Sequence, residues 1–228
     1  MFLRTTLFIP FFLYIIFPLY ASESTAANRW EPAIKKFETL DRKNPPQKEG
    51  ILFIGSSSIR MWDLDKSFPK LPVINRGFGG SHIADSIHFA DRIIFPYRPK
   101  TIVLYAGDND LAAGKSVATV VADYRRFVKT VQAKLPRTRI LFVAIKPSIA
   151  RWKLIDKIRA ANKQIQAETE KDKRLLFVDI DAPMIGPDGK PKADLFKKDG
   201  LHLNAKGYKL WNKIVGPLLV ECVHDAPE

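Results

Sequence analysis

Four short segments of the chain carry side chains that could work together as a hydrolytic site. They are "GSSS" (55–58), "NRGFGG" (75–80), "GDND" (107–110) and "DGLH" (199–202). In the last segment, the Asp199 carboxylate can fold back onto one imidazole nitrogen of His202, which leaves the other nitrogen free to act as a base. The same spacing also fits a surface loop in which Asp199 caps a turn and His202 is solvated.

The serine triplet could hold the matching nucleophile. Ser56, Ser57 and Ser58 follow a glycine at the end of an apolar run, which is typical of a buried strand that turns sharply into a helix. Such a turn can expose a hydroxyl beside the free N–H groups of the helix start, where a nearby base could activate it. The alternative is structural, because serines at such a place also cap helices or hold an anion.

The two remaining segments could stabilise negative charge. Glycines within 77–80 let the backbone approach a ligand closely, so that free N–H groups can point at it. Asn109 offers a side-chain amide that can donate a hydrogen bond to a developing oxyanion. Glycine turns and Asn/Asp clusters are common in loops, so neither segment is specific by itself.

The elements that must position these segments alternate along the chain. Strand-like runs cover 51–55, 72–77, 101–107, 139–145 and 174–180. Helical spacing covers 81–94, 116–135, 152–168 and a last stretch that begins near Asn204. This alternation predicts an α/β fold of three layers, α/β/α, around a five-stranded parallel sheet. Ligands of such sheets bind outside the carboxyl ends of the strands, where all these segments would lie along one rim.

The N-terminal residues are expected to direct export. Arg4 precedes an apolar stretch at 7–20 and the small residue Ala21, which is the layout of a signal peptide. That stretch is short for a membrane span of about 20 residues, so an uncleaved anchor is the less favoured alternative. We therefore expect a periplasmic or secreted protein. Its predicted parts are a signal peptide (1–21), an N-terminal helix and linker (22–48), a hydrolase domain (49–220) and a C-terminal tail (221–228).

Composition argues against several other classes of protein. The formal net charge is +13, but the basic residues are scattered and form no block with aromatic residues, so we expect no nucleic-acid partner. Cys222 is the only cysteine, which excludes an intramolecular disulfide. We find no ligand spacing typical of a metal site and no phosphate or dinucleotide loop, and therefore expect no metal and no cofactor.

Taken together and in this order, the four segments resemble the SGNH hydrolase superfamily, also called GDSL esterases and lipases. The resemblance covers about 49–218, and "NRGFGG" is similar to the subfamily that includes platelet-activating factor acetylhydrolase. One departure is that Ser56 stands where the family usually has an aspartate. The resemblance implies a flavodoxin-like fold and a catalytic triad of Ser57, His202 and Asp199. It also implies an oxyanion hole made by the backbone N–H groups of Ser57 and Gly80 and by the Asn109 amide.

We therefore predict an exported serine esterase that hydrolyses short-chain esters, with acetyl esters as the favoured class, through an acyl-enzyme. Its substrate would be a small ester, an O-acylated glycan or a lipid, and no stable membrane insertion is expected after cleavage of the signal. Trp62, Phe78 and Trp152 are predicted to contact substrate, although Trp62 and Trp152 could equally be packing residues. The alternatives are a lysophospholipase or thioesterase and, from another class, a non-catalytic anion-binding module.

Overall fold

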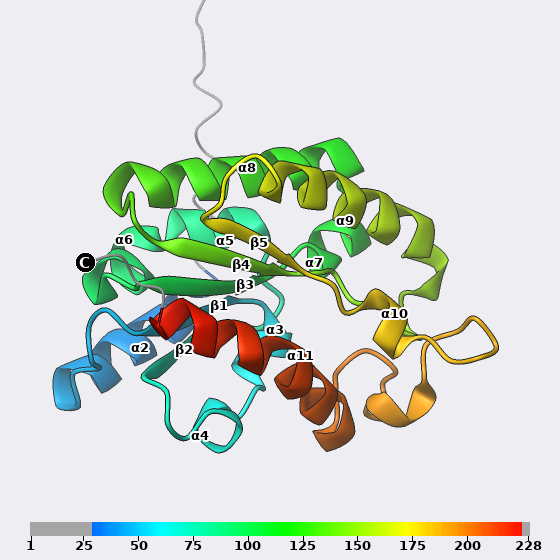
Figure 1. The fold of residues 1–228 in the computed structure, drawn as a ribbon, viewed down its shortest axis with the longest axis horizontal. Coiled ribbons are helices and arrows are strands. Elements are labelled where there is room, and N and C mark those ends of the chain that lie inside the picture. The colour runs from blue at the N-terminus through cyan, green and yellow to red at the C-terminus, as the bar shows by residue number, and fades with distance from the viewer. Residues whose placement is uncertain (1–28, 225–228) are drawn as a thin grey trace, which may run out of the picture.

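The computed structural model of the protein describes residues 29–224 (Figure 1), so the predicted signal peptide lies outside the described residues. Within this part, the sheet consists of β1 (Ile51–Gly55), β2 (Val73–Gly77), β3 (Thr101–Tyr105), β4 (Arg139–Val143) and β5 (Leu175–Val178). The strands lie in the order β2-β1-β3-β4-β5, and all neighbouring pairs are parallel. This is the doubly wound, flavodoxin-like order, and the predicted five-stranded parallel sheet is confirmed.

Helices precede, connect and follow the strands. They are α2 (Glu31–Lys43), α3 (Ser57–Arg60), α4 (Leu64–Ser67), α5 (Ile83–His88), α6 (Ala90–Ile93), α7 (Asp108–Ala112), α8 (Val117–Lys134), α9 (Ile155–Thr169), α10 (Asp181–Met184) and α11 (Ala205–His224). Three short 3₁₀ turns are η1 (Phe95–Tyr97), η2 (Trp152–Leu154) and η3 (Ala193–Leu195). The helix expected over 81–94 is broken into α5 and α6, because Phe89 leaves the helical conformation with φ −94° and ψ 8°.

Two separate cores lie on the two faces of the sheet. Successive strand residues point to opposite faces, so Leu52 and Ile54 pack with α2, α5, α6, α8 and α9. Ile51 and Phe53 pack on the other face with α3, α4, α10 and α11. Figure 1 shows α8 on one side of the sheet and α11 on the other. The three-layer architecture is therefore confirmed, and each fully buried aliphatic side chain stabilises it by roughly 1.5–3 kcal/mol.

Helix α8 illustrates how the sequence specifies these elements. Ser116 caps the N-terminus of α8, because its hydroxyl accepts a hydrogen bond from the backbone N–H of Thr119. The buried positions recur at helical spacing and are Val120, Val121, Tyr124, Phe127, Val128 and Val131. The opposite face stays exposed and polar, so burial of one stripe fixes how the helix lies on the sheet.

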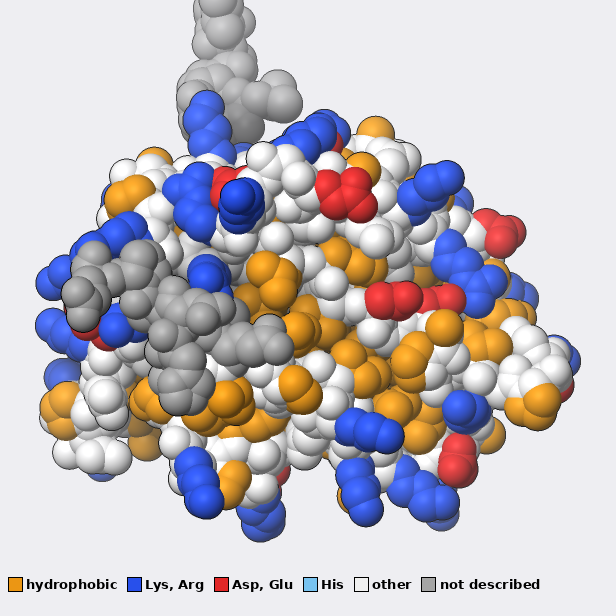
Figure 2. Space-filling model, viewed as in Figure 1, with side chains coloured by type: hydrophobic (Ala, Val, Ile, Leu, Met, Phe, Trp, Pro, Cys, Tyr) orange, Lys and Arg blue, Asp and Glu red, His pale blue; other side chains and the backbone are white. Residues whose placement is uncertain are grey.

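The turn after β1 depends on Gly55. Its φ of +132° is a conformation that other residues rarely adopt, and a Cβ there would lie 1.9 Å from the carbonyl oxygen of Tyr105. Glycine therefore lets β1 lie against β3 up to its last residue and then turn the chain into α3. On the face drawn in Figure 2, the Lys and Arg side chains lie at several separate places rather than in one patch.

Candidate active site

The structure brings Ser57, His202 and Asp199 into one line of contacts at the carboxyl edge of the sheet. Ser57 is the first residue of α3, directly after β1, and His202 lies in the loop before α11. His202 Nε2 lies 3.0 Å from Ser57 Oγ, and His202 Nδ1 lies 2.6 Å from Asp199 Oδ2. These are hydrogen-bond distances, so the imidazole can exchange a proton with the serine hydroxyl while the carboxylate holds its other nitrogen.

The Asp199 carboxylate is held as an anion. Its Oδ2 contacts the imidazole of His202, and its Oδ1 accepts hydrogen bonds of 2.9 Å from the N–H groups of Leu201 and His202. The imidazole contact, followed by the two backbone donors, lowers the pKa of Asp199 well below its ordinary value. The Asp199 side chain is 47% exposed, so water weakens the electrostatic part of these contacts.

The segment 185–204, which carries Asp199 and His202, is held by backbone hydrogen bonds and by the side chains of Leu195, Phe196 and Leu203, which are buried in the core beside α11. Isolated bridges pair Ile185 with Pro191 and Phe196 with Leu203. The N–H of Lys197 donates to the carbonyl of His202 at 2.7 Å. The carbonyl of Gly200, which has φ +62°, accepts a 3.0 Å bond from the N–H of Ala150 in the loop after β4. These few contacts hold the imidazole in reach of Ser57.

Only one of the three serines contacts the imidazole. Ser56 is buried, and its hydroxyl has no hydrogen-bond partner among the described residues. It makes no side-chain cap to α3, although a cap was the structural alternative for this triplet. Ser58 is also buried, and its hydroxyl accepts a bond from Lys146. The local geometry therefore selects Ser57 as the one serine that His202 can deprotonate.

Candidate donors to an oxyanion lie at the same edge. The N–H of Ser57 stands at the open start of α3, and Gly80 has φ +76° with free space where a side chain would lie. Within residues 29–224, neither N–H has a hydrogen-bond acceptor. Asn109 Nδ2 donates to the carbonyl of Ser81 at 3.0 Å, which ties the third predicted donor to the glycine segment.

Two of the three predicted substrate contacts are wrong, because the side chains are buried. Trp62 is 2% exposed, and its indole N–H donates to Asn212 at 2.8 Å within an aromatic cluster that includes Trp211. Phe78 is 0% exposed and packs edge-on against Trp30. Both side chains are core residues that pack against other aromatic rings.

Trp152 differs from the other two aromatic residues. It lies in η2 and keeps part of its surface exposed at the carboxyl edge of the sheet. Its neighbour Ile149 is 45% exposed, and a Cβ at Gly200 would lie 3.1 Å from the Ile149 side chain. Apolar surface thus borders the loop between Asp199 and His202.

A group of charged side chains whose mutual contacts the sequence did not predict lies beneath the site. The Lys146 side chain is 1% exposed, and its ammonium contacts Tyr105 Oη at 2.9 Å, Ser58 Oγ at 3.2 Å and Asp108 Oδ2 at 3.4 Å. Arg151 Nη1 lies 2.8 Å from the same Asp108 oxygen. The sequence placed Lys146 and Arg151 after the strand-like run 139–145, at the rim of the sheet, but gave no sign that they contact Asp108.

Burial and charge act in opposite directions within this group. Burial alone would raise the pKa of Asp108, but the charges of Lys146 and Arg151 outweigh burial, and the net effect is a lowered pKa. Burial is the main influence on Lys146 and lowers its pKa, while Asp108 acts in the opposite sense. The Asp108 carboxylate is thus stabilised as an anion between two cationic groups.

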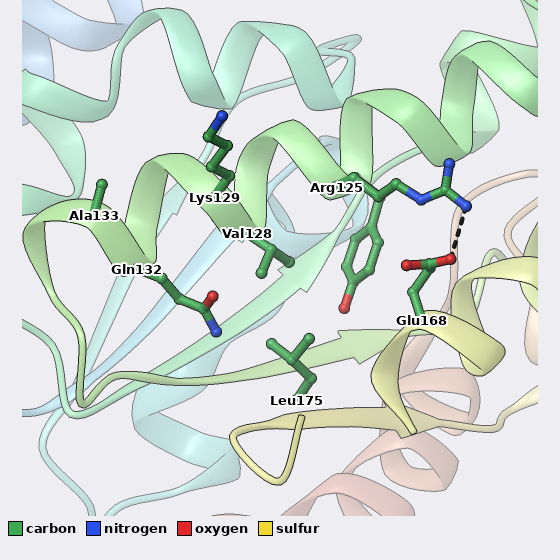
Figure 3. A pocket seen from close by; sticks show the side chains of 8 residues that line it. Arg125, Val128, Lys129, Gln132, Ala133, Glu168 and Leu175 are labelled. Carbon is green, nitrogen blue, oxygen red and sulfur yellow. Dashed lines mark hydrogen bonds and ion pairs between the residues drawn. The ribbon is translucent and has the colours of Figure 1, made fainter. Parts of the chain in front are cut away.

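A separate pocket lies away from these residues. It has a volume of about 380 Å³ and is lined by Tyr124, Arg125, Val128, Lys129, Gln132, Ala133, Glu168 and Leu175. Figure 3 shows Leu175 below α8 and the ion pair of 2.7 Å between Arg125 and Glu168 at one side. Because Leu175 is the first residue of β5, the pocket lies toward the amino edge of the sheet, opposite to Ser57. Among residues 29–224 no cluster of three or more His, Cys, Asp or Glu side chains is placed to bind a metal.

The sheet order defines the fold class as three-layer α/β, with Ser57, His202 and Asp199 in contact at the carboxyl edge of the sheet. The model of the GDSL-like Lipase/Acylhydrolase family matches residues 59–210, and the chain belongs to this family of carboxylic ester hydrolases. The match begins two positions after Ser57. No curated protein matches the chain. In the described part, no helix has both the length and the apolar character to cross a membrane.

Solved structures share the fold at low sequence identity. A Streptococcus pneumonia protein provisionally described as a platelet activating factor has 22% identity and a TM-score of 0.76, with 86% of this chain and 95% of that chain covered. A GDSL-like lipase from Bacteroides thetaiotaomicron has 18% identity and a TM-score of 0.70, with 82% and 97% covered. Axe2, an acetylxylan esterase from Geobacillus stearothermophilus, has 15% identity and a TM-score of 0.61, with 76% and 95% covered.

Proposed function

We propose that the protein is a serine esterase that uses Ser57 as its nucleophile. The observation that carries the proposal is the line of contacts from Asp199 through His202 to Ser57, at 2.6 and 3.0 Å. A site that only binds an anion needs hydrogen-bond donors, but it needs no histidine base and no carboxylate to orient that base. The contacts among Asp199, His202 and Ser57 therefore favour catalysis over a non-catalytic anion-binding module.

The reaction proceeds in two halves. Ser57 Oγ attacks the acyl carbon while His202 Nε2 takes the hydroxyl proton, and His202 then gives that proton to the departing alcohol as the ester C–O bond breaks. In the second half, His202 takes a proton from water, which attacks the acyl-enzyme, and returns it to Ser57 as the acid leaves. Asp199 keeps the proton on Nδ1, so that Nε2 is the basic nitrogen.

Each half passes through a tetrahedral intermediate whose oxygen is negative. The N–H groups of Ser57 and Gly80 and the Asn109 amide are the donors that would receive this charge. Loss of one such donor typically costs about 2.7–4 kcal/mol of transition-state stabilisation. The free N–H groups at the edge of the sheet support this assignment.

We propose short acyl groups, acetyl above all, as the preferred substrates. Of the large hydrophobic side chains that are exposed in the described residues, Ile149 borders the loop that carries His202, and Trp152 and Leu201 beside it are partly buried. The pocket at α8 lies at the other edge of the sheet and cannot receive an acyl chain attached to Ser57. Axe2, a structural neighbour, is an acetylxylan esterase, which is consistent with a sugar-borne acetyl ester.

The test combines labelling with a series of esters. A fluorophosphonate probe should label the wild type, Ser56→Ala and Ser58→Ala, but not Ser57→Ala. Catalytic efficiency should be higher for 4-nitrophenyl acetate than for the octanoate and palmitate esters. Absence of labelling in folded wild-type protein would favour the non-catalytic alternative, and a preference for palmitate would favour a lysophospholipase.

We also propose that the protein is exported. The proposal rests on the basic start, apolar stretch and Ala21 of the N-terminal 21 residues. Expression of the full chain followed by mass spectrometry of its N-terminus in cell fractions tests it. An N-terminus near Ser22 in the periplasmic or secreted fraction is expected, whereas a full-length chain in the membrane fraction would point to an uncleaved anchor.

A further inference from the structure

The side-chain amide of Asn109 is held on both sides by groups of fixed hydrogen-bonding character. Arg151 Nη2 donates to Asn109 Oδ1 at 2.8 Å, and Asn109 Nδ2 donates to the carbonyl oxygen of Ser81 at 3.0 Å. A guanidinium has only donors and a carbonyl only accepts, so one of the two possible amide orientations satisfies both contacts. The nitrogen is therefore turned toward the glycine segment, and it keeps a second N–H for another acceptor.

Arg151 is itself held by the buried charges beneath the site. Its Nη1 lies 2.8 Å from Asp108 Oδ2 as an ion pair without hydrogen-bond alignment. Asp108 Oδ1 accepts a hydrogen bond from the backbone N–H of Asn109 at 2.9 Å. Asn109 is therefore held by the Asp108 carboxylate at its backbone and by the Arg151 guanidinium at its side chain. Lys146 approaches Asp108 at 3.4 Å and reaches Ser58, the residue after Ser57, at 3.2 Å.

Both terminal nitrogens of Arg151 thus have partners within the protein. Its side chain is 17% exposed, which is low for an arginine in a rim loop. An arginine that binds substrate needs a donor that the ligand can reach, whereas Arg151 Nη1 has almost no exposed surface and Nη2 already donates to Asn109 Oδ1. The contacts of Arg151 instead indicate that it orients another side chain of the protein, the amide of Asn109.

We propose that Arg151 is a positioning residue that fixes the Asn109 amide with its nitrogen facing the oxyanion. The proposal rests on the function proposed above. Without Arg151, the Asn109 oxygen loses its donor, and the Ser81 carbonyl alone holds the amide, so its second N–H is no longer fixed in the direction of the developing negative charge. Asp108 and Lys146 serve this arrangement by holding the guanidinium and by linking it to the turn that carries Ser57.

A double-mutant cycle tests the proposal. Arg151→Met should lower kcat for 4-nitrophenyl acetate by about tenfold with KM little changed, which is less than the roughly 10²–10³-fold expected for loss of an oxyanion donor. Asn109→Ala should show that larger loss, and Arg151→Met/Asn109→Ala should be no slower than Asn109→Ala alone. A raised KM, or effects of the two changes that multiply, would overturn the proposal by showing that Arg151 acts directly on substrate.

Two further variants control for charge and folding. Arg151→Lys keeps the positive charge but cannot span Asp108 and Asn109 together, so it should lose kcat as well, and full activity would overturn the bridging role. Arg125→Met removes an exposed arginine that pairs with Glu168 on α9, and its kcat should equal that of the wild type. If Arg151→Met does not fold in a thermal melt, Arg151→Lys/Asn109→Ala provides the same cycle.

An NMR measurement separates this proposal from the esterase proposal. The side-chain NH₂ signals of Asn109 are identified as the pair missing from the spectrum of Asn109→Ala. In the wild type, the proton bonded to Ser81 should be shifted away from its partner, and in Arg151→Met the two should move together. An unchanged pair would overturn the positioning role whether or not the protein hydrolyses esters. Conversely, an inactive wild type with the expected shifts would refute only the esterase proposal.

Discussion

Replacement of Asp199 by asparagine should slow the enzyme by changing the tautomer of His202. The two backbone N–H groups of Leu201 and His202 would keep the asparagine oxygen at the Oδ1 position. The amide nitrogen would then face His202 Nδ1, where two donors cannot meet. The favourable response is for Nδ1 to lose its proton and Nε2 to carry it, and a protonated Nε2 cannot accept the proton of Ser57.

The size of the effect follows from the exposure of the carboxylate. In buried triads the same change costs about 10⁴-fold in kcat. The Asp199 side chain is 47% exposed, so water already weakens its electrostatic stabilisation of the protonated imidazole. The loss of activity in Asp199→Asn then comes mainly from the wrong tautomer of His202. We therefore expect a loss of roughly 10³-fold, or about 4.1 kcal/mol. Asp199→Ala should be less harmful than Asp199→Asn, because water can take the place of the carboxylate and accept the Nδ1 proton.

The assay is kcat with 4-nitrophenyl acetate at a pH well above the ordinary range of histidine. Asp194→Asn is the matched control, since Asp194 is exposed in the same segment and pairs only with Lys206 at 3.4 Å. It should leave kcat unchanged. The tautomer reasoning would be refuted if Asp199→Asn were as active as the wild type, or if Asp199→Ala were clearly slower than Asp199→Asn.

Three further predictions concern the site and the stability of the fold. His202→Ala should abolish hydrolysis almost as completely as Ser57→Ala, because the two act as one unit; residual kcat well above that of Ser57→Ala would contradict this. Gly55→Ala should lower the free energy of unfolding by about 3 kcal/mol or more, because its Cβ would meet the Tyr105 carbonyl. Gly114→Ala, with φ +88° and open space, should cost only about 1 kcal/mol in the same denaturant titration. Tyr124→Phe should raise the free energy of unfolding by about 1 kcal/mol, since the buried hydroxyl has no partner in the described structure, and a loss of stability would show that this hydroxyl is satisfied.

The sheet was predictable because its strands are continuous apolar runs, which leave few other interpretations in a chain of this length. The strand ends were less accurate. The run 101–107 was expected to be a strand throughout, but β3 ends at Tyr105 and Gly107 takes φ +112°. The apolar run continues beyond the last residue of β3 because the first residues of the following turn are also buried. Hydropathy alone therefore cannot show where this strand ends.

The aromatic residues show where local sequence could not decide. Trp62 and Phe78 stand beside functional segments, and position alone cannot tell a residue that faces a ligand from one that closes the core beneath it. Trp62 reaches Asn212, which is 150 positions away in the chain, and this contact fixes its inward orientation. The role of Arg151 was likewise out of reach, because its partners come from the separate loop after β3.

The attachment of the segment 185–204 has a consequence for heat inactivation. The nucleophile starts α3 directly after the turn that follows β1, a strand paired on both sides within the sheet. The base and its carboxylate lie instead in a loop between Phe196 and Leu203, which two isolated bridges and a few backbone bonds hold in place. Segments with few such contacts open without unfolding the rest of the protein. Phe196 and Leu203 belong to the core beside α11, so opening of the loop 197–202 between them would carry His202 away from Ser57 while both cores stay packed. The protein should therefore stop turning over substrate at a temperature at which its secondary structure is still native, and activity should return on cooling.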